Sequence, residues 1–387
     1  DYTKIDRMRS VGIITIVKVN NYGAELQAFA LQCKLELMGY RAEIIDYLFY
    51  KHPQHKREKC SEPFYPYPFK KRCKEWLLPK WEWLKCQMHR DASNRRNERF
   101  DAFHRKNTHF SVHCYNSYTE LYNNPPQYDV YCVGSDQVWN PGCYTSINPY
   151  FVSFAPKGKR RISYASSFGV KNIPHSARMK YQTLLEDMDA ISVREDAGVK
   201  LVKDLSGKTA VKVADPTLLL TKEEWSAVAK FDKVPREKYI LLYVLKDSDY
   251  ITQQAIALGK IKGLKVIRIC KGAFKQDRAS SGIENIIDAA PDDFLGLISK
   301  AEMILTNSFH GTVFSILFER DFYTIVKRSV ENNSRQLSLL DTLKIDRIKY
   351  EDTTFKEATP INWKMVGNAL SDFRQKSIDY LNQVING

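Results

Sequence analysis

A histidine at the start of a predicted helix is the chain's best candidate for proton transfer. His310 lies in the segment Asn-Ser-Phe-His-Gly at 307–311, between a short apolar run at 303–305 and helically spaced apolar residues at 310–318. The start of a helix offers unpaired backbone N–H groups and a partial positive charge, which bind anions. An imidazole can take up or release a proton near neutral pH. The turn therefore suits chemistry on an anionic substrate, and the alternative is that His310 only satisfies a buried polar partner.

Two series of alternating strands and helices are predicted to hold this turn. The first series has strands at 11–17, 42–47, 128–133, 161–165, 190–193 and 211–214, with helices at 23–38, 174–187 and 195–203. The second series has strands at 239–245, 264–269, 303–305 and 322–326, with helices at 248–258, 291–300 and 310–318. Such alternation is typical of parallel sheets covered by helices. We therefore expect an α/β protein of two doubly wound, Rossmann-like domains, residues 1–215 and 216–387, facing a cleft, with the last helix packing back on the first domain.

The loops that follow the predicted strands are the expected ligand-binding loops. In doubly wound sheets, ligands bind outside the carboxyl ends of the strands. Four polar loops fall there, at 20–23, 134–140, 166–169 and 307–310. The chain has neither G-x-G-x-x-G nor G-x-x-x-x-G-K-[ST], so the motifs of dinucleotide-binding and P-loop proteins are absent.

Composition excludes several classes of protein. The 387 residues are 43% hydrophobic and 27% charged, as in globular proteins, and no apolar run approaches the roughly 18 residues that span a bilayer. The eight cysteines are scattered without C-x-x-C spacing, which argues against a disulfide framework or a metal site. The first residues carry no signal-peptide pattern. We therefore expect a cytoplasmic protein that needs no metal or other cofactor.

A basic segment rich in aromatic residues supplies most of the chain's excess of positive charge. The chain has a net charge of +14, and the segment 51–106 contains 16 basic and 7 acidic residues among its tryptophans and phenylalanines. Such a segment suits a helical hairpin packed by its aromatic face, a helix lying on anionic lipid, or a surface for single-stranded nucleic acid. We expect a helical insertion over about 51–110, and the prolines at 63, 66 and 68 exclude a continuous helix before about Lys70.

Six blocks of the chain resemble, in the same order, those of the polysaccharide pyruvyl transferases. They read N-N-Y-G-A-E-L-Q-A-F-A-L at 20–31, V-G-S-D-Q-V-W-N-P at 133–141, S-Y-A-S-S-F-G at 163–169, I-S-V-R-E at 191–195, D-P-T at 215–217 and N-S-F-H-G at 307–311. The resemblance covers roughly residues 11–345. The G-S-D-Q-V-W-N and S-F-H-G blocks are specific in combination, whereas D-P-T alone would be weak.

The resemblance implies a fold, a reaction and partners. The fold would be similar to the two-domain glycosyltransferase-B type. The reaction would move the enolpyruvyl unit of phosphoenolpyruvate onto two hydroxyls of a sugar as a cyclic ketal, with release of phosphate. The acceptor would be a precursor of a surface or capsular polysaccharide. We expect it to be a lipid-linked oligosaccharide, met at an anionic membrane surface on the inner face of the membrane, and we expect no nucleic acid partner.

The same resemblance implies a catalytic set of three residues. Arg194 would clamp the phosphate or carboxylate of phosphoenolpyruvate, together with the helix N-termini at Gly23 and Ser308. His310 would act as acid toward the phosphate or steady its charge. Asp136 would bind the acceptor hydroxyls or take their proton, and its alternative role is to cap the turn after a strand.

The remaining candidates would bind substrate. Gln137 and Asn140 would read the sugar by hydrogen bonds, and Trp139 would offer it a stacking face. The full set of expected substrate-binding residues is Asn20, Asn21, Gly23, Ser135, Gln137, Trp139, Asn140, Ser166, Asn307, Ser308 and Arg335.

One position departs from the family pattern. Several members resemble S-R-x-H at the last block, whereas this chain has Ser308 where the arginine would stand. A second cation for the donor must then come from elsewhere. Arg335, predicted to lead a helix of the same domain, is our candidate, and Arg328 and Lys327 are the alternatives.

Two other functions compete with this interpretation. A glycosyltransferase that uses a nucleotide sugar would share the fold, so the fold alone does not separate the two. The C-terminal half lacks a pair of acidic residues placed to bind a ribose, which disfavours that function. A basic nucleic-acid-binding protein is the third class, but the basic stretch is local and no known nucleic-acid module surrounds it.

Overall fold

A parallel sheet of five strands forms the core of the N-terminal half. The computed structural model describes residues 8–64, 68–270, 272, 282–328 and 333–387. The strands are β1 (Ser10–Ile14), β2 (Arg41–Tyr47), β3 (Phe110–Tyr115), β4 (Val130–Val133) and β5 (Arg160–Ser163), in the order β3-β2-β1-β4-β5. The short strands β6 (Ser192–Val193) and β7 (Val211–Lys212) pair beside β5. The helices are α2 (Tyr22–Leu37), α5 (Tyr118–Asn123), α6 (His175–Glu186) and α7 (Asp196–Ser206).

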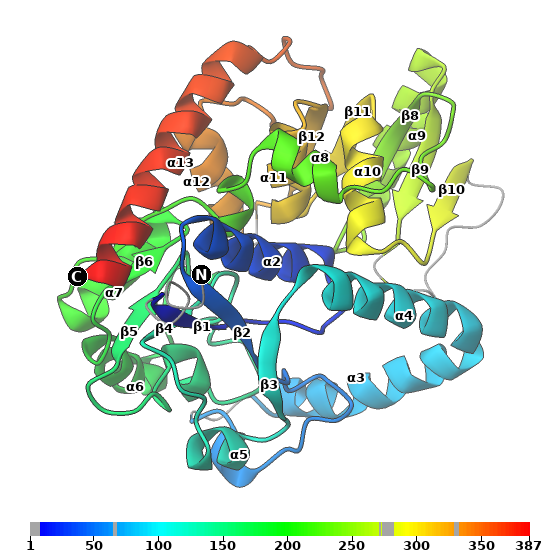
Figure 1. The fold of residues 1–387 in the computed structure, drawn as a ribbon. Helices are drawn as coiled ribbons and strands as arrows, with labels where there is room; N and C mark the ends of the chain where they lie inside the picture. Colours follow the sequence, from blue (N-terminus) through cyan, green and yellow to red (C-terminus); the bar gives the residue numbers. More distant parts are fainter. Residues whose placement is uncertain (1–7, 65–67, 271, 273–281, 329–332) are drawn as a thin grey trace.

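A second parallel sheet, of six strands, forms the core of the C-terminal half. Its strands are β8 (Tyr239–Tyr243), β9 (Lys265–Ile269), β10 (Ile283–Ile286), β11 (Met303–Thr306), β12 (Asp321–Val326) and β13 (Ile348–Tyr350), in the order β10-β9-β8-β11-β12-β13. Its helices are α8 (Lys222–Val228), α9 (Asp249–Lys262), α10 (Pro291–Lys300), α11 (Phe309–Leu317) and α12 (Ser334–Thr342). The predicted arrangement of two doubly wound domains is confirmed (Figure 1).

The strand register brings the expected ligand-binding loops together. At the carboxyl end of the first sheet, Ile14 pairs with Val133, so the chain after β1 and the loop after β4 leave the sheet side by side. In the second sheet, Thr306 pairs with Tyr243, which aligns the loops after β11 and β8. Because the strands of each sheet are parallel, these loops all lie at carboxyl ends, where polar side chains can surround a ligand.

Helix α2 lies between the two sheets and joins them (Figure 1). It contacts α10 and α11 of the C-terminal half. The ring of Tyr22, at its first position, stacks on Phe294 with centroids 4.9 Å apart, and its hydroxyl donates to the carbonyl of Ala289 at 3.0 Å. All three residues are buried. The two halves therefore share one hydrophobic core at this point.

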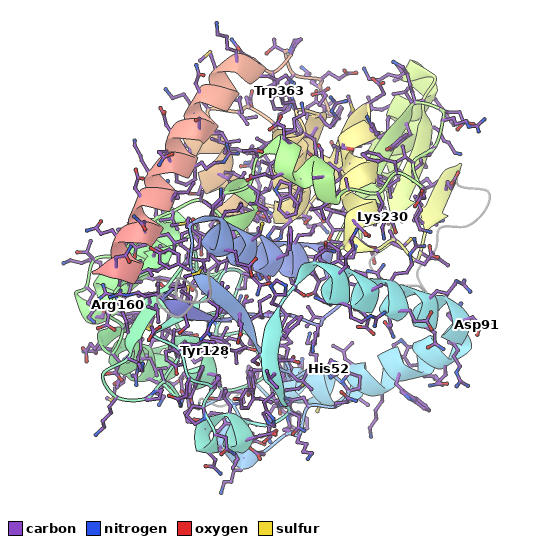
Figure 2. All side chains as sticks on the ribbon, viewed as in Figure 1. His52, Asp91, Tyr128, Arg160, Lys230 and Trp363 are labelled. Atoms are coloured by element: carbon purple, nitrogen blue, oxygen red, sulfur yellow. The ribbon has the colours of Figure 1, made fainter. Side chains whose placement is uncertain are left out.

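The last helix, α13 (Trp363–Asn386), returns to the N-terminal half (Figure 1). Figure 2 labels Trp363 at its start and Arg160 beside its end. Arg160 donates to the carbonyl of Val384, and the hydroxyl of Tyr40 donates to Asn382 at 2.6 Å. A helix that begins in one half and ends against the other limits how far the halves can separate. The boundary between domains at residue 215 stays a prediction.

Several elements differ from those predicted. Strand β1 ends at Ile14 rather than at residue 17, because its pairing with β4 ends there, at Val133. Strands β3, β10 and β13 were not predicted. All three are edge strands, and their mixed polar sequences lack the apolar run of a central strand.

The basic segment forms two consecutive helices, α3 (Phe69–Met88) and α4 (Arg90–Asn107). Figure 2 labels Asp91 near the outer tip where they meet. Phe100 and Phe103 of α4 are buried in the core, whereas Trp81 and Trp83 of α3 are exposed. Among the described side chains, those of α4 therefore reach the core, whereas the two tryptophans of α3 face solvent. The aromatic and proline residues expected to lead into it at 65–67 lie outside the described residues. Among the described residues, no helix is long and apolar enough to cross a membrane.

We predict that Ser377→Ala destabilises the protein by about 1–3 kcal/mol, because it leaves a buried donor without an acceptor. The buried Ser377 hydroxyl accepts from the backbone N–H of Ala214 at 2.9 Å and ties α13 to the N-terminal half. The free energy of unfolding in urea measures the effect. Ser371→Ala, on an exposed position of the same helix, is the control. Equal stability of the two variants would mean that this contact does not hold the helix.

Candidate active site

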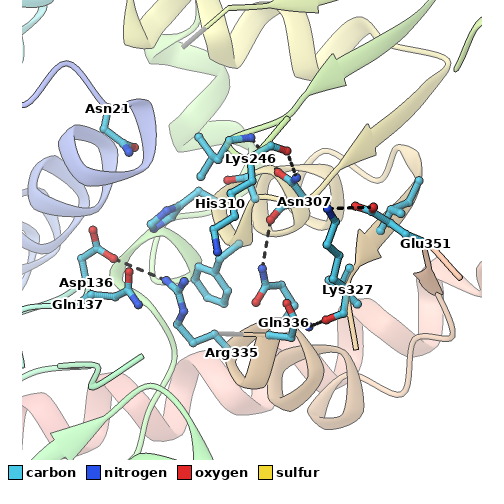
Figure 3. Close-up of a pocket in the computed structure, with 16 residues that line it drawn as sticks. Asn21, Asp136, Gln137, Lys246, Asn307, His310, Lys327, Arg335, Gln336 and Glu351 are labelled. Carbon is cyan, nitrogen blue, oxygen red and sulfur yellow. Dashed lines mark hydrogen bonds and ion pairs between the residues drawn. The ribbon is translucent and has the colours of Figure 1, made fainter. Parts of the chain in front are cut away.

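A cavity of about 180 Å³ lies where the two halves face each other (Figure 3). The N-terminal half contributes the start of α2 and the loop after β4. The C-terminal half contributes the loop after β8, the turn between β11 and α11, the end of β12, the start of α12 and the residue after β13. The lining residues are Asn21, Asp136, Gln137, Leu245, Lys246, Asn307, Ser308, Phe309, His310, Ile325, Val326, Lys327, Asn333, Arg335, Gln336 and Glu351.

His310, from the C-terminal half, lies on the side of the cavity that is nearest the N-terminal half (Figure 3). Ser308 caps α11 by accepting from the N–H of Gly311 at 3.2 Å, which sets His310 in the first turn. The imidazole is 6% exposed, and its Nε2 atom lies 3.7 Å from a carboxylate oxygen of Asp215. A Cβ atom at Gly23 would lie 2.0 Å from Nδ1. Glycine at position 23 is therefore what allows α2 to approach the histidine.

Asp215 binds Arg194 behind the cavity and lies beside His310. One of its oxygens accepts from Nη1 of Arg194 at 2.6 Å and from the hydroxyl of Ser135 at 3.1 Å. The other accepts from the N–H and hydroxyl of Thr217 at 3.0 and 2.6 Å. Burial by itself would raise the pKa of Asp215, but His310, Arg194 and the Thr217 hydrogen bond hold that pKa well below its ordinary value. Asp215 is therefore a carboxylate at neutral pH.

Asp136 links this buried group to the cavity. Its Oδ1 atom lies 3.2 Å from Nη2 of Arg194 and 3.8 Å from Nη1 of Arg335. Its φ of 66° lies in the left-handed region, which an aspartate tolerates better than most residues. Burial opposes ionisation of Asp136, but Arg194, His310 and Arg335 lower its pKa below the ordinary value. A carboxylate with a lowered pKa is a weak base, so Asp136 is better suited to accept hydrogen bonds than protons.

Two arginines lie near the ring of Phe309, and one of them, Arg335, lines the cavity. Arg194 lies over its ring at 4.4 Å and has both terminal nitrogens bonded to carboxylates. Arg335 lies 5.6 Å from the same ring and lines the cavity. Burial, and then repulsion by Arg194, lower the pKa of Arg335 to about 10, so it is still a cation at neutral pH.

The structure corrects the expected roles of several buried residues. Trp139 is not placed to stack on a sugar, because it is fully buried, stacks on Phe151 and donates its indole N–H to the carbonyl of Tyr150 at 2.7 Å. Ser135 and Ser166 are also fully buried and bond to the protein itself. The motif indicated residue types that can bind a sugar. It did not indicate burial, which depends on packing against distant segments.

Three further candidates also face away from the cavity or are already bonded. The N–H of Gly23 donates to the side chain of Asn21 at 3.0 Å, so it is not a free anion donor. Asn20 donates to Asn97 of α4 at 2.6 Å, and Asn140 accepts from Gly142 in its own turn. These three are not among the lining residues, whereas Asn21, Gln137, Asn307, Ser308 and Arg335 are.

Sequence reasoning missed Asp215 as a site residue, together with Lys246, Gln336 and Glu351, and named Lys327 only as an alternative. Lys246 and Lys327 each follow the carboxyl end of a strand, and this position was the signal that could have found them. Lys327, which was an alternative for the second cation, lies 3.5 Å from the carboxylate of Glu351. Arg328, the other alternative, pairs with Asp352 at 3.1 Å and does not line the cavity.

The arrangement can bind a small anion between a histidine and several cations. Lys246 is exposed, and within the described part of the chain its side chain has no ion-pair partner. Asn307 holds the loop that carries Lys246, because its side chain accepts from the N–H of Leu245 and donates to the carbonyl of Lys246. No group of three or more His, Cys, Asp or Glu side chains among the described residues could hold a metal ion.

Comparison with known proteins identifies the family and the fold. The sequence profile of a family described as polysaccharide pyruvyl transferase matches residues 21–326. No curated protein matches the chain. A UDP-GlcNAc 2-epimerase from Methanocaldococcus jannaschii is similar in structure, with 11% identity and a TM-score of 0.50 over 97% of this chain and 99% of that one. The Arabidopsis thaliana protein UGT89C1, complexed with quercetin, has 11% identity and a TM-score of 0.48 over 98% and 100% of the two chains. The likeness to the epimerase agrees with the expected α/β fold of two doubly wound domains.

We predict that Asp215→Asn lowers the free energy of unfolding by about 3–5 kcal/mol at neutral pH, because Arg194 is left buried without its closest counter-charge. The folded-state pKa of Asp215 is lowered, so its stabilisation is present above the ordinary carboxyl pKa and is lost as pH falls through the folded-state value. Urea unfolding at a series of pH values from about 7 to about 2 measures this. The free energy of unfolding should fall less with pH in the variant than in the wild type.

Asp204→Asn removes an exposed ion pair with Lys200 and is the control, with an expected change below about 1 kcal/mol. Identical pH profiles for wild type and Asp215→Asn would contradict the role given to this carboxylate.

Proposed function

The chain belongs to the polysaccharide pyruvyl transferase family, and we propose that it transfers a pyruvyl group from phosphoenolpyruvate to two hydroxyls of a sugar in a polysaccharide precursor. The observation that carries this proposal is a small cavity lined by cations around a histidine. Phosphoenolpyruvate carries a phosphate and a carboxylate, so its site needs more than one cation. Arg335, Lys246 and Lys327 supply three.

The size of the cavity supports a small donor. Sites for drug-sized ligands usually enclose about 300–1,000 Å³, and this cavity encloses about 180 Å³. Phosphoenolpyruvate is much smaller than a nucleotide sugar and suits the smaller space. The structural neighbours include a UDP-GlcNAc 2-epimerase, but that likeness concerns the fold and not the donor.

Arg335 is our candidate for the second donor-binding cation, in place of the arginine missing at Ser308. It reaches the cavity from α12 and lies over Phe309, next to the position that the missing arginine would occupy. It also lies beyond the residues matched by the family profile, as expected of a compensation particular to this chain. Arg194, whose terminal nitrogens already hold Asp136 and Asp215, is then a positioning residue that aligns Asp136.

The reaction needs two proton movements, and the site offers His310 for one of them. One sugar hydroxyl adds to C2 of the enolpyruvyl unit, and the second hydroxyl displaces the phosphate from the same carbon. Of the two hydroxyl protons, one ends on the methylene carbon, which becomes a methyl group, and the other leaves with the phosphate. His310 would carry a proton to the phosphate, since its imidazole can both accept and donate. Asp136 would orient the hydroxyls as a hydrogen-bond acceptor.

We expect phosphoenolpyruvate to raise the melting temperature of the protein, because a ligand that binds only the folded state stabilises it, by about 2.7 kcal/mol at a hundredfold excess over Kd. Uridine, guanosine and thymidine diphosphates should raise it less. Differential scanning fluorimetry measures these shifts. Larger shifts with a nucleoside diphosphate would favour a glycosyltransferase that uses a nucleotide sugar.

We expect His310→Ala to lower turnover at least about a hundredfold, the usual loss when a proton-transfer group is removed. Phosphate release from phosphoenolpyruvate with a sugar acceptor, together with the mass gain of the sugar, measures turnover. His175→Ala, at an exposed histidine on α6, is the control and should keep normal turnover. Near-normal turnover of His310→Ala would remove the histidine from the mechanism.

We expect Arg335→Gln to raise the KM for phosphoenolpyruvate at least about tenfold, since a charge-assisted contact to a bound anion contributes about 1.5–3 kcal/mol. Steady-state kinetics at saturating acceptor measure this constant. Arg328→Gln replaces an exposed arginine outside the cavity lining and is the matched control. An equal effect of both substitutions would show that Arg335 has no special part in donor binding.

A further inference from the structure

Helix α3 presents a stripe of apolar side chains to solvent. Residues spaced by three or four positions share one face of a helix. The stripe consists of Phe69, Cys73, Leu77, Trp81, Leu84 and Met88. Phe69 is 78% exposed, Trp81 59% and Leu77 53%. Apolar groups so exposed along one helix usually mark an interaction surface.

A largely apolar hollow of about 660 Å³ runs along this stripe. It is lined by Leu77, Leu78, Trp81 and Leu84 together with Cys73, and the stems of two lysines border it. The stripe spans a helix of 20 residues, which corresponds to a length of about 30 Å. The surface is therefore long, narrow and apolar, unlike the compact cavity between the domains.

The other helix of the hairpin holds this surface on the molecule. Arg96 of α4 donates to the hydroxyl of Tyr22 at 2.5 Å and to the carbonyl of Asn20 at 3.1 Å. Arg99 of α4 lies 3.2 Å from the carboxylate of Asp293, in the C-terminal half. Helix α4 thus contacts both halves, and α3 extends along its outer side (Figure 1). The stripe therefore lies on a helix that adjoins an element in contact with both halves.

Positive charge accompanies the stripe. Helix α3 contains six basic and two acidic residues, and the whole chain carries a net charge of +14. Lys70, Arg72 and Lys80 are exposed. Trp83, 63% exposed, lies on an adjoining face. A helix with an apolar stripe, flanking lysines and tryptophans is the kind that lies in the interface of an anionic bilayer.

Charge and side-chain type favour lipid over other occupants. A second copy of the chain would bring another strongly basic surface against the first, which repulsion disfavours. Single-stranded nucleic acid would satisfy the charge and could stack on Phe69 and Trp81, but Leu77, Leu84 and Met88 would stay exposed to water beside it, because bases bind by stacking on rings. Lipid acyl chains would remove the aliphatic side chains from water, and anionic headgroups would pair with the lysines.

We propose that α3 docks the protein on an anionic lipid bilayer, with the stripe from Phe69 to Met88 inserted between the headgroups. The hairpin reaches the site, since Asn97 and Arg96 of α4 contact Asn20, the neighbour of Asn21 in the cavity lining. Docking would bring the cavity near the membrane, where a lipid-linked acceptor is found. This last consequence rests on the proposed function, whereas the docking itself does not.

The test is co-sedimentation of the full chain with vesicles. We expect binding to mixed phosphatidylcholine and phosphatidylglycerol vesicles at low salt, and weak binding to pure phosphatidylcholine. Added salt should weaken the binding to mixed vesicles, because it screens the lysines. Lys70→Glu with Lys80→Glu should lower the partition coefficient at least about tenfold, as should Leu77→Glu with Trp81→Glu. Both pairs are exposed, so circular dichroism should show the fold unchanged.

The matched control is Leu37→Glu with Ile261→Glu, which changes two exposed apolar residues on α2 and α9 and should bind like the wild type. Equal binding of the control and the stripe variants, or no binding of the wild type to mixed vesicles, would overturn the proposal. A single-stranded oligonucleotide that displaces the wild-type protein from mixed vesicles would also overturn it, if the stripe variants no longer bind that oligonucleotide.

Pyruvyl transfer to a soluble sugar acceptor separates this proposal from the proposed function. The stripe variants should keep wild-type turnover in that assay, because none of the described α3 side chains lines the cavity. Vesicle binding without any pyruvyl transfer would contradict the proposed function and would still support the proposed docking of α3.

Discussion

The buried ion pair between Arg194 and Asp215 is the contact on which the site depends. A guanidinium that is 5% exposed is stable only if carboxylates compensate it, and Asp215 and Asp136 do so. Asp215 in turn lies beside His310, which comes from the other half of the molecule. Asp215 therefore has contacts in both halves of the molecule. The histidine, the aspartate in the cavity and the interface between domains are parts of one electrostatic arrangement.

Backbone shape sets the distances in this arrangement. Gly23 lets α2 approach His310, and Gly134, at a φ of 119°, lets the loop after β4 pass within contact of the carbonyl of Tyr164. A Cβ atom at Gly134 would lie 2.2 Å from that carbonyl oxygen. The loop then sends Ser135 inward to Asp215 and Asp136 outward to the cavity. One turn thus supplies both the buried support and the group that faces substrate.

The fold and the chemistry are separable in this protein. The same two-domain architecture occurs in a UDP-GlcNAc 2-epimerase at 11% identity, so the sheets by themselves do not specify a donor. The loops after β8 and β12 and the start of α12 give the cavity its cations, and the loop after β4 gives it an aspartate. The hairpin of α3 and α4 adds a second surface, and its attachment to both halves relates that surface to the cavity.

The fold, its central strands and the position of His310 could be predicted from the sequence, because apolar periodicity and turn residues are local signals. The motifs also indicated the family. The tertiary structure decided which side chains reach the cavity, since that depends on packing between segments distant in sequence. Trp139 and Ser135 have the residue types of a sugar site yet are fully buried, whereas Arg335 faces the cavity from beyond the matched segment. Asp215 looked like a turn residue, and only the approach of Arg194 and His310 from elsewhere makes it the counter-charge of the site.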